Sequence, residues 1–171
     1  MRELIATYCN TLKLGARIVK NYSQIQAETH EAFLAELLTM EIEARELNRK
    51  NILLKKAQFD VLKTFGDFRF EKMSIPNTID VEALKTASFI DKKENLILYG
   101  SVGLGKTHLA TAIGVESCNR GKRVRFFRTT SLVNQLLDAK AEGNLKRFFK
   151  QLNKTDLIIC DEWGFIPFEK E

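Results

Sequence analysis

Cysteine is scarce in this sequence of 171 residues, and long apolar runs are absent. Its three cysteines, Cys9, Cys118 and Cys160, lie far apart and form no CxxC pair, which argues against a disulfide framework or a zinc site and favours reduced thiols. No apolar run approaches the roughly 20 residues that span a bilayer, and the first residues lack the apolar core of a secretory signal. We therefore expect no membrane association and a cytoplasmic location.

Positive charge is concentrated in one part of the chain. Residues 120–154 hold ten basic and two acidic side chains, whereas the rest of the chain holds 17 of the 27 basic and 20 of the 22 acidic residues. This excess predicts either a surface that binds polyanions such as nucleic acid or a solvated basic face without a ligand. Composition alone leaves both interpretations open.

The N-terminal third of the sequence predicts helices. Apolar residues at alternating spacings of four and three predict an amphipathic helix of about 28 residues with Thr29 as its N-cap and with favourable Glu41–Arg45 and Glu46–Lys50 pairs. This apolar seam packs either on the preceding segment 4–19, which breaks near Gly15, or on a partner protein or neighbouring subunits. The seam consists of Phe33, Leu37, Met40, Ala44, Leu47 and Leu54.

The pattern of apolar and polar residues changes after residue 62. We predict a helical partner-binding domain at 1–62, a linker with Pro76 at 63–79 and an α/β core at 80–171. Strands that alternate with helices predict a mostly parallel sheet covered by helices. The predicted strands are 95–99, 123–127 and 156–160, and the predicted helices are about 80–90, 106–120, 131–140 and 144–153, with breaks at Gly121 and Gly143.

Residues 100–107 fit the phosphate-binding pattern G-x-x-x-x-G-K-[ST], between a predicted strand and a predicted helix. The glycines let backbone N–H groups approach phosphate oxygens at the positive end of a helix dipole. Lys106 supplies a charge to the β- and γ-phosphates, and the Thr107 hydroxyl is a suitable ligand for Mg²⁺. The predicted cofactors are therefore ATP and Mg²⁺. The predicted nucleotide-binding residues are Gly100, Ser101, Val102, Gly103, Leu104, Gly105, Lys106, Thr107 and His108.

Two carboxylates follow the apolar run at 157–160, at the strand end where ligands bind in parallel sheets. We predict that Asp161 holds the Mg²⁺ together with Thr107. Glu162 is predicted to orient and deprotonate the water that attacks the γ-phosphate, so that Glu162 and Lys106 are the predicted catalytic residues. The His108 side chain is expected to pack or to hydrogen-bond near the helix end, and Trp163 and Phe165 are expected to be core or interface aromatics.

With these motifs, the sequence resembles the IstB family of transposition helper ATPases, AAA+ proteins related to the DnaC helicase loaders. The resemblance rests on GKTHLA at 105–110, GKRVRFF at 121–127, LVNQLL at 132–137, AEG at 141–143 and DEWGFIPF at 161–168. It implies a P-loop AAA+ fold with the sheet order 5-1-4-3-2. It also implies an ATP-dependent homo-oligomer that assembles on DNA, bends it and recruits a transposase through the helical N-terminal domain.

The resemblance also bears on the basic stretch, because in related initiator-type ATPases a helical insertion at the position of 131–153 faces DNA. It therefore favours DNA contact over a bare solvated face. Such contacts give affinity without sequence specificity. Arg123 and Arg125 lie on a predicted strand and are expected to serve the fold. The candidate phosphate contacts are Lys140, Lys146, Arg147 and Lys150.

The family continues beyond residue 171 with a fourth and a fifth strand, a sensor residue, an arginine finger and a helical lid. The fourth strand lies between those at 95–99 and 156–160, so we expect a truncated, frameshifted or partial protein in which these strands either pair directly or leave a slot with unpaired backbone groups. ATP turnover by this chain is left open.

Three functions stay open: a transposition helper, a replicative helicase loader, and a non-hydrolysing remnant that binds DNA or transposase. Residues 65–70 are candidates for the adenine pocket.

Overall fold

The computed structural model describes residues 1–70, 73, 75–76 and 79–163. The chain forms two compact units, residues 1–51 and 52–171, and the division falls inside one long helix. The linker expected at 63–79 stays a prediction. None of the helices in the described ranges is both long and apolar enough to cross a membrane.

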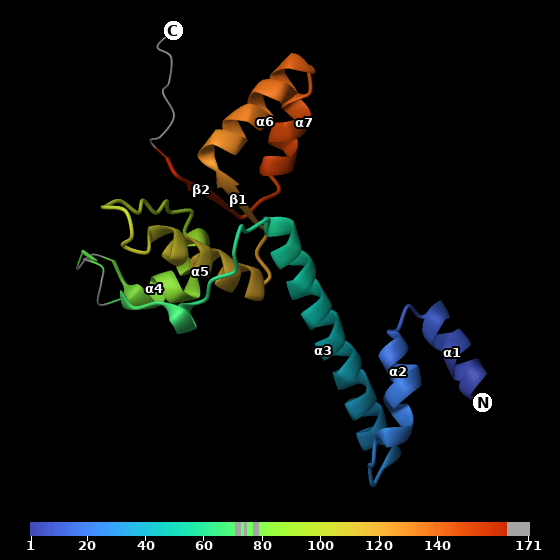
Figure 1. The fold of residues 1–171 in the computed structure, drawn as a ribbon. Coiled ribbons are helices and arrows are strands. Elements are labelled where there is room, and N and C mark those ends of the chain that lie inside the picture. Colours follow the sequence, from blue (N-terminus) through green and yellow to red (C-terminus); the bar gives the residue numbers. More distant parts are fainter. Residues whose placement is uncertain (71–72, 74, 77–78, 164–171) are drawn as a thin grey trace. The chain divides into compact units, whose positions relative to one another are not determined.

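The first unit is entirely helical in its regular structure. It contains α1 (Arg2–Thr11), α2 (Ala16–Asn21), the short 3-10 helix η1 (Tyr22–Gln24) and the first part of α3 (His30–Ala57) (Figure 1). Helix α3 is 28 residues long, and Thr29 Oγ1 accepts a hydrogen bond from the Ala32 N–H at 3.1 Å. The predicted length and N-cap of this helix are therefore confirmed.

A buried carboxylate holds the turn between α1 and α2 against α3. Glu41 is only 5% exposed and accepts hydrogen bonds from the Gly15 N–H at 2.9 Å and from Arg45 Nε at 2.7 Å. Arg45 in turn donates to the Lys13 carbonyl at 2.6 Å. The predicted Glu41–Arg45 pair is confirmed, and Ala44 of the predicted seam is buried. The turn after α1 thus contacts α3 within this unit, whereas Leu47 of the seam is 48% exposed, so packing of the whole seam on segment 4–19 stays a prediction.

The second unit carries the α/β part of the chain. Its small elements are η2 (Phe65–Asp67), α4 (Val81–Thr86) and η4 (Ser88–Ile90), and Asp80 caps α4 by accepting a hydrogen bond from the Glu82 N–H at 2.9 Å. The larger elements match the predicted positions to within two residues. They are α5 (Lys106–Asn119), β1 (Val124–Arg128), α6 (Thr129–Ala141), α7 (Leu145–Leu152) and β2 (Leu157–Asp161).

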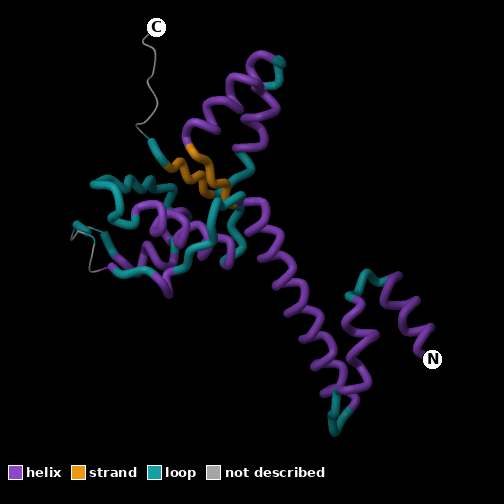
Figure 2. The backbone as a smooth tube through the Cα atoms, in the orientation of Figure 1, coloured by secondary structure: helices purple, strands orange, loops and turns teal. Residues whose placement is uncertain are grey.

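The two strands of the described part of the chain lie parallel and side by side (Figure 2). Their register pairs Val124 with Leu157 and Arg128 with Asp161. Helices α6 and α7 form the crossover between these strands, as a parallel connection requires.

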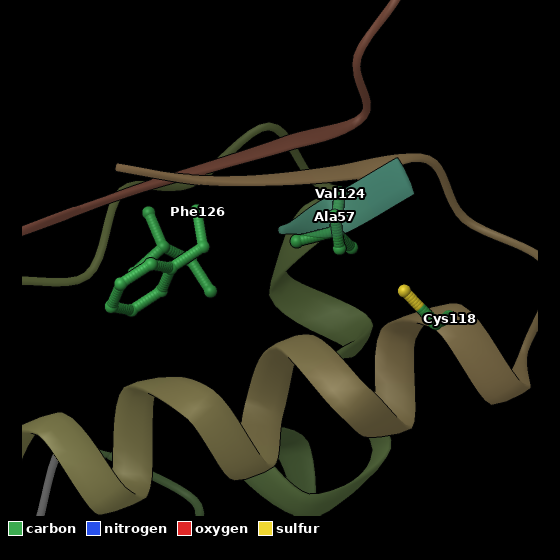
Figure 3. Close-up of a cluster of buried hydrophobic side chains, with 5 residues drawn as sticks. Ala57, Cys118, Val124 and Phe126 are labelled. Carbon is green, nitrogen blue, oxygen red and sulfur yellow. The ribbon is translucent and has the colours of Figure 1, made fainter. Parts of the chain in front are cut away.

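The core of the second unit lies between this sheet and α5. Figure 3 shows Val124 and Phe126 on the strand side and Cys118 on the helix, with Ala57 from the end of α3 beside them. All of these side chains are at most 5% exposed. A second hydrophobic cluster surrounds Leu109, which lies near the start of α5. The aromatic side chains of segment 65–70 pack against this cluster.

The strand predicted at 95–99 is not formed, so this prediction was wrong. Ile97 and Tyr99 are 82% and 88% exposed, whereas Leu96 and Leu98 pack against the second cluster. The two-residue alternation of a strand is therefore present without a hydrogen-bonded ladder. The physical reason is that no strand in the described ranges lies beside this segment to pair with its backbone. The sequence left two arrangements open, in which segment 95–99 either pairs directly with the strand at 156–160 or leaves a slot with unpaired backbone groups. Segment 95–99 does not pair with β2.

Candidate functional site

The loop at 100–107 leads directly into α5. Gly103 and Gly105 have φ values of +85° and +88°, a backbone region that residues with a Cβ atom adopt at a cost. At Gly105 there is a second constraint, since an added Cβ would lie 3.3 Å from the ring of Phe68. The glycines of the motif thus permit the turn that brings the loop backbone to the first turn of α5.

Lys106 folds its side chain back over this loop. Its Nζ donates to the carbonyls of Gly100 and Ser101, both at 2.8 Å. An ammonium group has three N–H donors, so two bonds to the loop leave one for an anion. The charge of Lys106 is therefore placed at the mouth of the loop.

Thr107 links the loop to the end of β2. Its Oγ1 donates to Asp161 Oδ1 at 3.1 Å, across 54 positions of sequence. Thr129, which is 2% exposed, donates to the Asp161 carbonyl at 2.6 Å and holds the strand end from the other side. The structure thus brings together the two residues that the sequence predicted as the magnesium pair.

The two oxygens fit a magnesium ion. Octahedral Mg²⁺ binds oxygen at about 2.0–2.1 Å, which places adjacent ligands about 2.9 Å apart. The observed 3.1 Å between Thr107 Oγ1 and Asp161 Oδ1 is close to that spacing. Because the threonine proton points to the carboxylate, the lone pairs of its oxygen are free to face a cation.

Glu162 lies directly after β2 in an unusual backbone conformation. Its φ is +59°, in the left-handed region that glutamate rarely occupies, and its side chain is exposed. Strand β2 ends at Asp161, immediately before this residue. Trp163 is 67% exposed, and the expected role of Phe165 lies outside the described residues.

His108 packs against the neighbouring segment, as the sequence suggested, and its place in the nucleotide-binding set stays a prediction. Its Nε2 lies 3.0 Å from the Thr64 carbonyl, and its ring meets Phe68 edge to face at 5.2 Å. The histidine therefore fastens segment 64–68 to the first turn of α5. This contact also places Phe68 beside the phosphate-binding loop. That residues 65–70 line the adenine pocket stays a prediction.

The basic stretch divides into paired and exposed side chains. Arg123 makes a two-point bond to Asp156, at 3.0 and 2.8 Å, which raises the pKa of the arginine and lowers that of the aspartate. Arg125 donates to Gln58 at 2.8 Å. These two arginines serve the fold, as expected. The four candidate DNA contacts on α6 and α7 are exposed: Lys140, Lys146, Arg147 and Lys150.

Sequence reasoning missed three residues near the strand ends, namely Asp60, Arg128 and Thr129. Arg128 Nε donates to Asp60 Oδ2 at 2.7 Å, and Arg128 lies opposite Asp161 in the strand register. Asp60 first, and then the charges of Glu162 and Asp161, raise the pKa of Arg128. The position of Arg128 and Thr129 at the end of a predicted parallel strand was the available signal.

The sequence from residue 9 to residue 171 matches the family model of the IstB-like ATP binding protein. The chain belongs to this family. Its P-loop AAA+ fold and its nucleotide-binding character follow from that membership.

The relatives of this IstB-like chain include proteins of insertion sequences. It is 33% identical over 99% of its length to a protein of insertion sequence IS5376 from Geobacillus stearothermophilus, and 34% identical over 83% to one of IS21 from Pseudomonas aeruginosa. Both relatives are named for ATP binding. The chain spans 69% and 54% of their lengths. A replication initiator, DnaA of Rickettsia bellii, is 28% identical over 96% of the chain, which agrees with the AAA+ assignment.

Proposed function

We propose that the chain binds ATP with Mg²⁺ and acts as the ATPase component that assists transposition of an insertion sequence. The observation that carries the proposal is the Thr107–Asp161 contact at 3.1 Å, which joins the phosphate loop to the acidic end of β2. The names of the relatives supply the biological setting, since they belong to insertion sequences and are named for ATP binding.

Each residue of the site has a chemical task in this proposal. Loop N–H groups and Lys106 bind the phosphates, and Thr107 and Asp161 hold the magnesium ion. The bound ion would neutralise charge on the β- and γ-phosphate oxygens. Glu162, next along the chain, orients a water molecule and takes its proton.

The proposal extends to DNA because of α7. Leu145, Phe148 and Leu152 of this helix are half-buried, whereas Lys146, Arg147 and Lys150 are exposed. With Lys140 of α6 they are four exposed basic side chains on two helices whose connecting turn also holds the exposed Glu142. Such side chains are suited to phosphate contacts of no sequence preference.

We further propose that the first unit recruits the transposase and that the chain works as a homo-oligomer. Support comes from apolar side chains spaced four apart on the outer faces of two helices, where a partner helix could bury them. These side chains are 44–67% exposed: Leu4 and Tyr8 on α1 with Leu12 directly after it, and Leu34, Leu38 and Ile42 on α3.

A second function, nucleotide binding without turnover, has its own supporting observation. The segment before the loop, 95–99, lies outside the sheet, so the loop is joined to β2 through the Thr107 side chain rather than through a shared ladder. A site held in this way binds phosphate but has less support for the alignment that hydrolysis needs.

ATP binding and release of phosphate, measured with and without DNA, test these functions. We expect Glu162→Gln to keep the affinity for MgATP and to lower turnover at least about 100-fold. The measurement should include a chain extended beyond Glu171. Binding without turnover in both chains would favour the second function, and no binding in either would contradict both. A helicase loader would be indicated if the chain bound a replicative helicase in place of a transposase.

A further inference from the structure

A small cavity lies between β1 and α7. Arg125 and Phe127 are spaced two apart and share one face of β1, opposite to the face on which Val124 and Phe126 join the core cluster with α5. Helix α7 and the loop after it provide the other side of the cavity, which has a volume of about 70 Å³. Its lining residues are Arg125, Phe127, Phe148, Gln151, Leu152 and Thr155.

The lining combines hydrogen-bond donors with apolar walls. Arg125, Gln151 and Thr155 bring a guanidinium, an amide and a hydroxyl, and none of the six lining residues is acidic. Two phenylalanines and a leucine form the rest of the lining. Because the cavity has a positive charge and no negative charge of its own, it favours an anion over a cation.

The guanidinium of Arg125 has an unpaired donor. Its Nη2 donates to Gln58 at 2.8 Å, and its Cζ lies over the ring of Phe127, 5.0 Å from the centroid. Its buried Nε, however, has no hydrogen-bond acceptor among the residues that the structure describes. A buried N–H without an acceptor costs stability, and few such groups occur in folded proteins. An acceptor beside Arg125 would complete its hydrogen bonding.

Other arginines of the chain indicate the kind of acceptor that fits. The Nε atoms of Arg45, Arg120, Arg123 and Arg128 each donate to a carboxylate oxygen, at 2.7 to 3.0 Å. A guanidinium also binds a carboxylate through two parallel N–H groups, which fixes the orientation of the acid. A carboxylate brought by a ligand would therefore give Arg125 the partner that these four arginines have within the chain.

The size and the walls of the cavity select a small acid. A site needs about 10–15 Å³ of such volume to hold one water molecule, so this cavity holds a group of several non-hydrogen atoms and not a nucleotide. The apolar walls suit a hydrocarbon stem, whereas phosphate or sulfate would lose hydration against them. We propose that the cavity binds a carboxylate on a short apolar stem, from a free short-chain acid or from a glutamate side chain of a partner.

The side-chain Nε–H signal of Arg125 in heteronuclear NMR spectra reports such a ligand directly, and Arg125→Gln identifies the signal. Propionate should shift it downfield with saturation, at a Kd in the millimolar range. The Nε–H of Arg123 already donates to Asp156 at 3.0 Å, so its signal should stay in place. Propionamide, which has the same shape without the charge, should bind at least about tenfold more weakly.

A variant that fills the cavity tests its location. Leu152→Phe leaves Arg125 in place and should weaken propionate binding at least about tenfold, because the larger ring takes up the space. Leu137→Phe is the matched control, since the same enlargement falls on a leucine of α6 that is 57% exposed and outside the cavity lining. Its affinity for propionate should equal that of the parent. Equal affinities for the two variants would overturn the proposal.

A capped glutamate, N-acetyl-glutamate amide, separates the two sources of the carboxylate. Tighter binding than that of propionate would support a partner's side chain, and binding of propionate alone would support a free acid. The proposal would be overturned if neither compound shifted the Arg125 signal, if propionamide bound as well as propionate, or if inorganic phosphate bound more tightly. These titrations contain no ATP or DNA, so their failure would leave the proposed function standing.

Discussion

The hydroxyl of Thr107 donates to Asp161, and this single bond connects the first turn of α5 with the end of β2. The same proton fixes the direction of the threonine lone pairs, which a magnesium ion would use. The two residues therefore depend on each other, and changes in either one should affect metal-dependent binding first.

Thr107→Ala should lower the affinity for MgATP about tenfold and leave the affinity for ATP in EDTA nearly unchanged, because only the metal ligand is lost. Thr107→Ser is the control, since it keeps the hydroxyl. Titration of a fluorescent ATP analogue with and without Mg²⁺ measures both. Equal losses with and without the metal would show that Thr107 acts on the loop and not on the ion.

Lys106→Ala should weaken ATP binding at least about tenfold, because a charged donor to the phosphates disappears. The exposed Lys92→Ala, which removes a lysine outside the loop, is the control. The same titration in EDTA separates this effect from that of the metal. Unchanged nucleotide affinity in Lys106→Ala would refute the assignment of the phosphate loop.

Reversal of charge at Lys146, Arg147 and Lys150 should weaken DNA binding and reduce the slope of log K against log salt by up to about 2.7, or about 0.9 for each lost phosphate contact. The control reverses Arg49, Lys55 and Lys56, which are likewise one arginine and two lysines, exposed on α3. Fluorescence anisotropy at several salt concentrations gives the slope. Equal slopes for the two triple variants would mean that α7 has no special part in binding DNA.

Glu41→Gln should destabilise the packing of the α1–α2 turn on α3 by about 1–3 kcal/mol, because the buried carboxylate accepts two hydrogen bonds there. The hydrogen bond from Arg45 holds the pKa of Glu41 below its usual range. Its stabilisation is therefore complete above the unfolded pKa of about 4.3 and is lost as the pH falls through the folded value. Hydrogen exchange of residues 1–24 should increase in the variant at pH 7, and should increase in the parent only in acid.

Gly114→Ala should destabilise the second unit by about 1 kcal/mol net. An added Cβ would lie 2.7 Å from the ring of Phe59 and 2.8 Å from Ile159, and such overpacking outweighs the helix preference of alanine. Adding Phe59→Leu should recover part of the loss, which thermal unfolding of the four chains in the cycle would reveal. Additive losses would mean that the two residues do not meet.

Much of the fold could be predicted because local signals agreed with the final packing. Thr29 marked the start of α3, and Gly121 and Gly143 marked helix ends by adopting positive φ values, of +81° and +71°. The apolar run at 157–160 became β2 because β1 lies beside it. The sequence could predict that Thr107 and Asp161 lie close together, because Thr107 follows the phosphate loop and Asp161 ends a parallel strand, and ligands bind at that edge of a parallel sheet.

The failures have a common physical cause, since each depended on a contact distant in sequence. Segment 95–99 has the composition of a strand, yet a strand is defined by its neighbour. The Asp60–Arg128 pair joins residues 68 positions apart, and neither residue type is unusual at its place. The charges and spacing of residues along the chain do not indicate which side chains, distant in sequence, will form such ion pairs.

The alternating exposure of segment 95–99 has one further consequence, for the order in which a larger sheet could assemble. Leu96 and Leu98 are already anchored in the cluster around Leu109, while Ile97 and Tyr99 face outward. A slip by one residue would exchange these two sets, so the anchored leucines exclude it. The two packed leucines thus fix which face of the segment points to the core, and a neighbouring strand could pair with its backbone without turning the segment over.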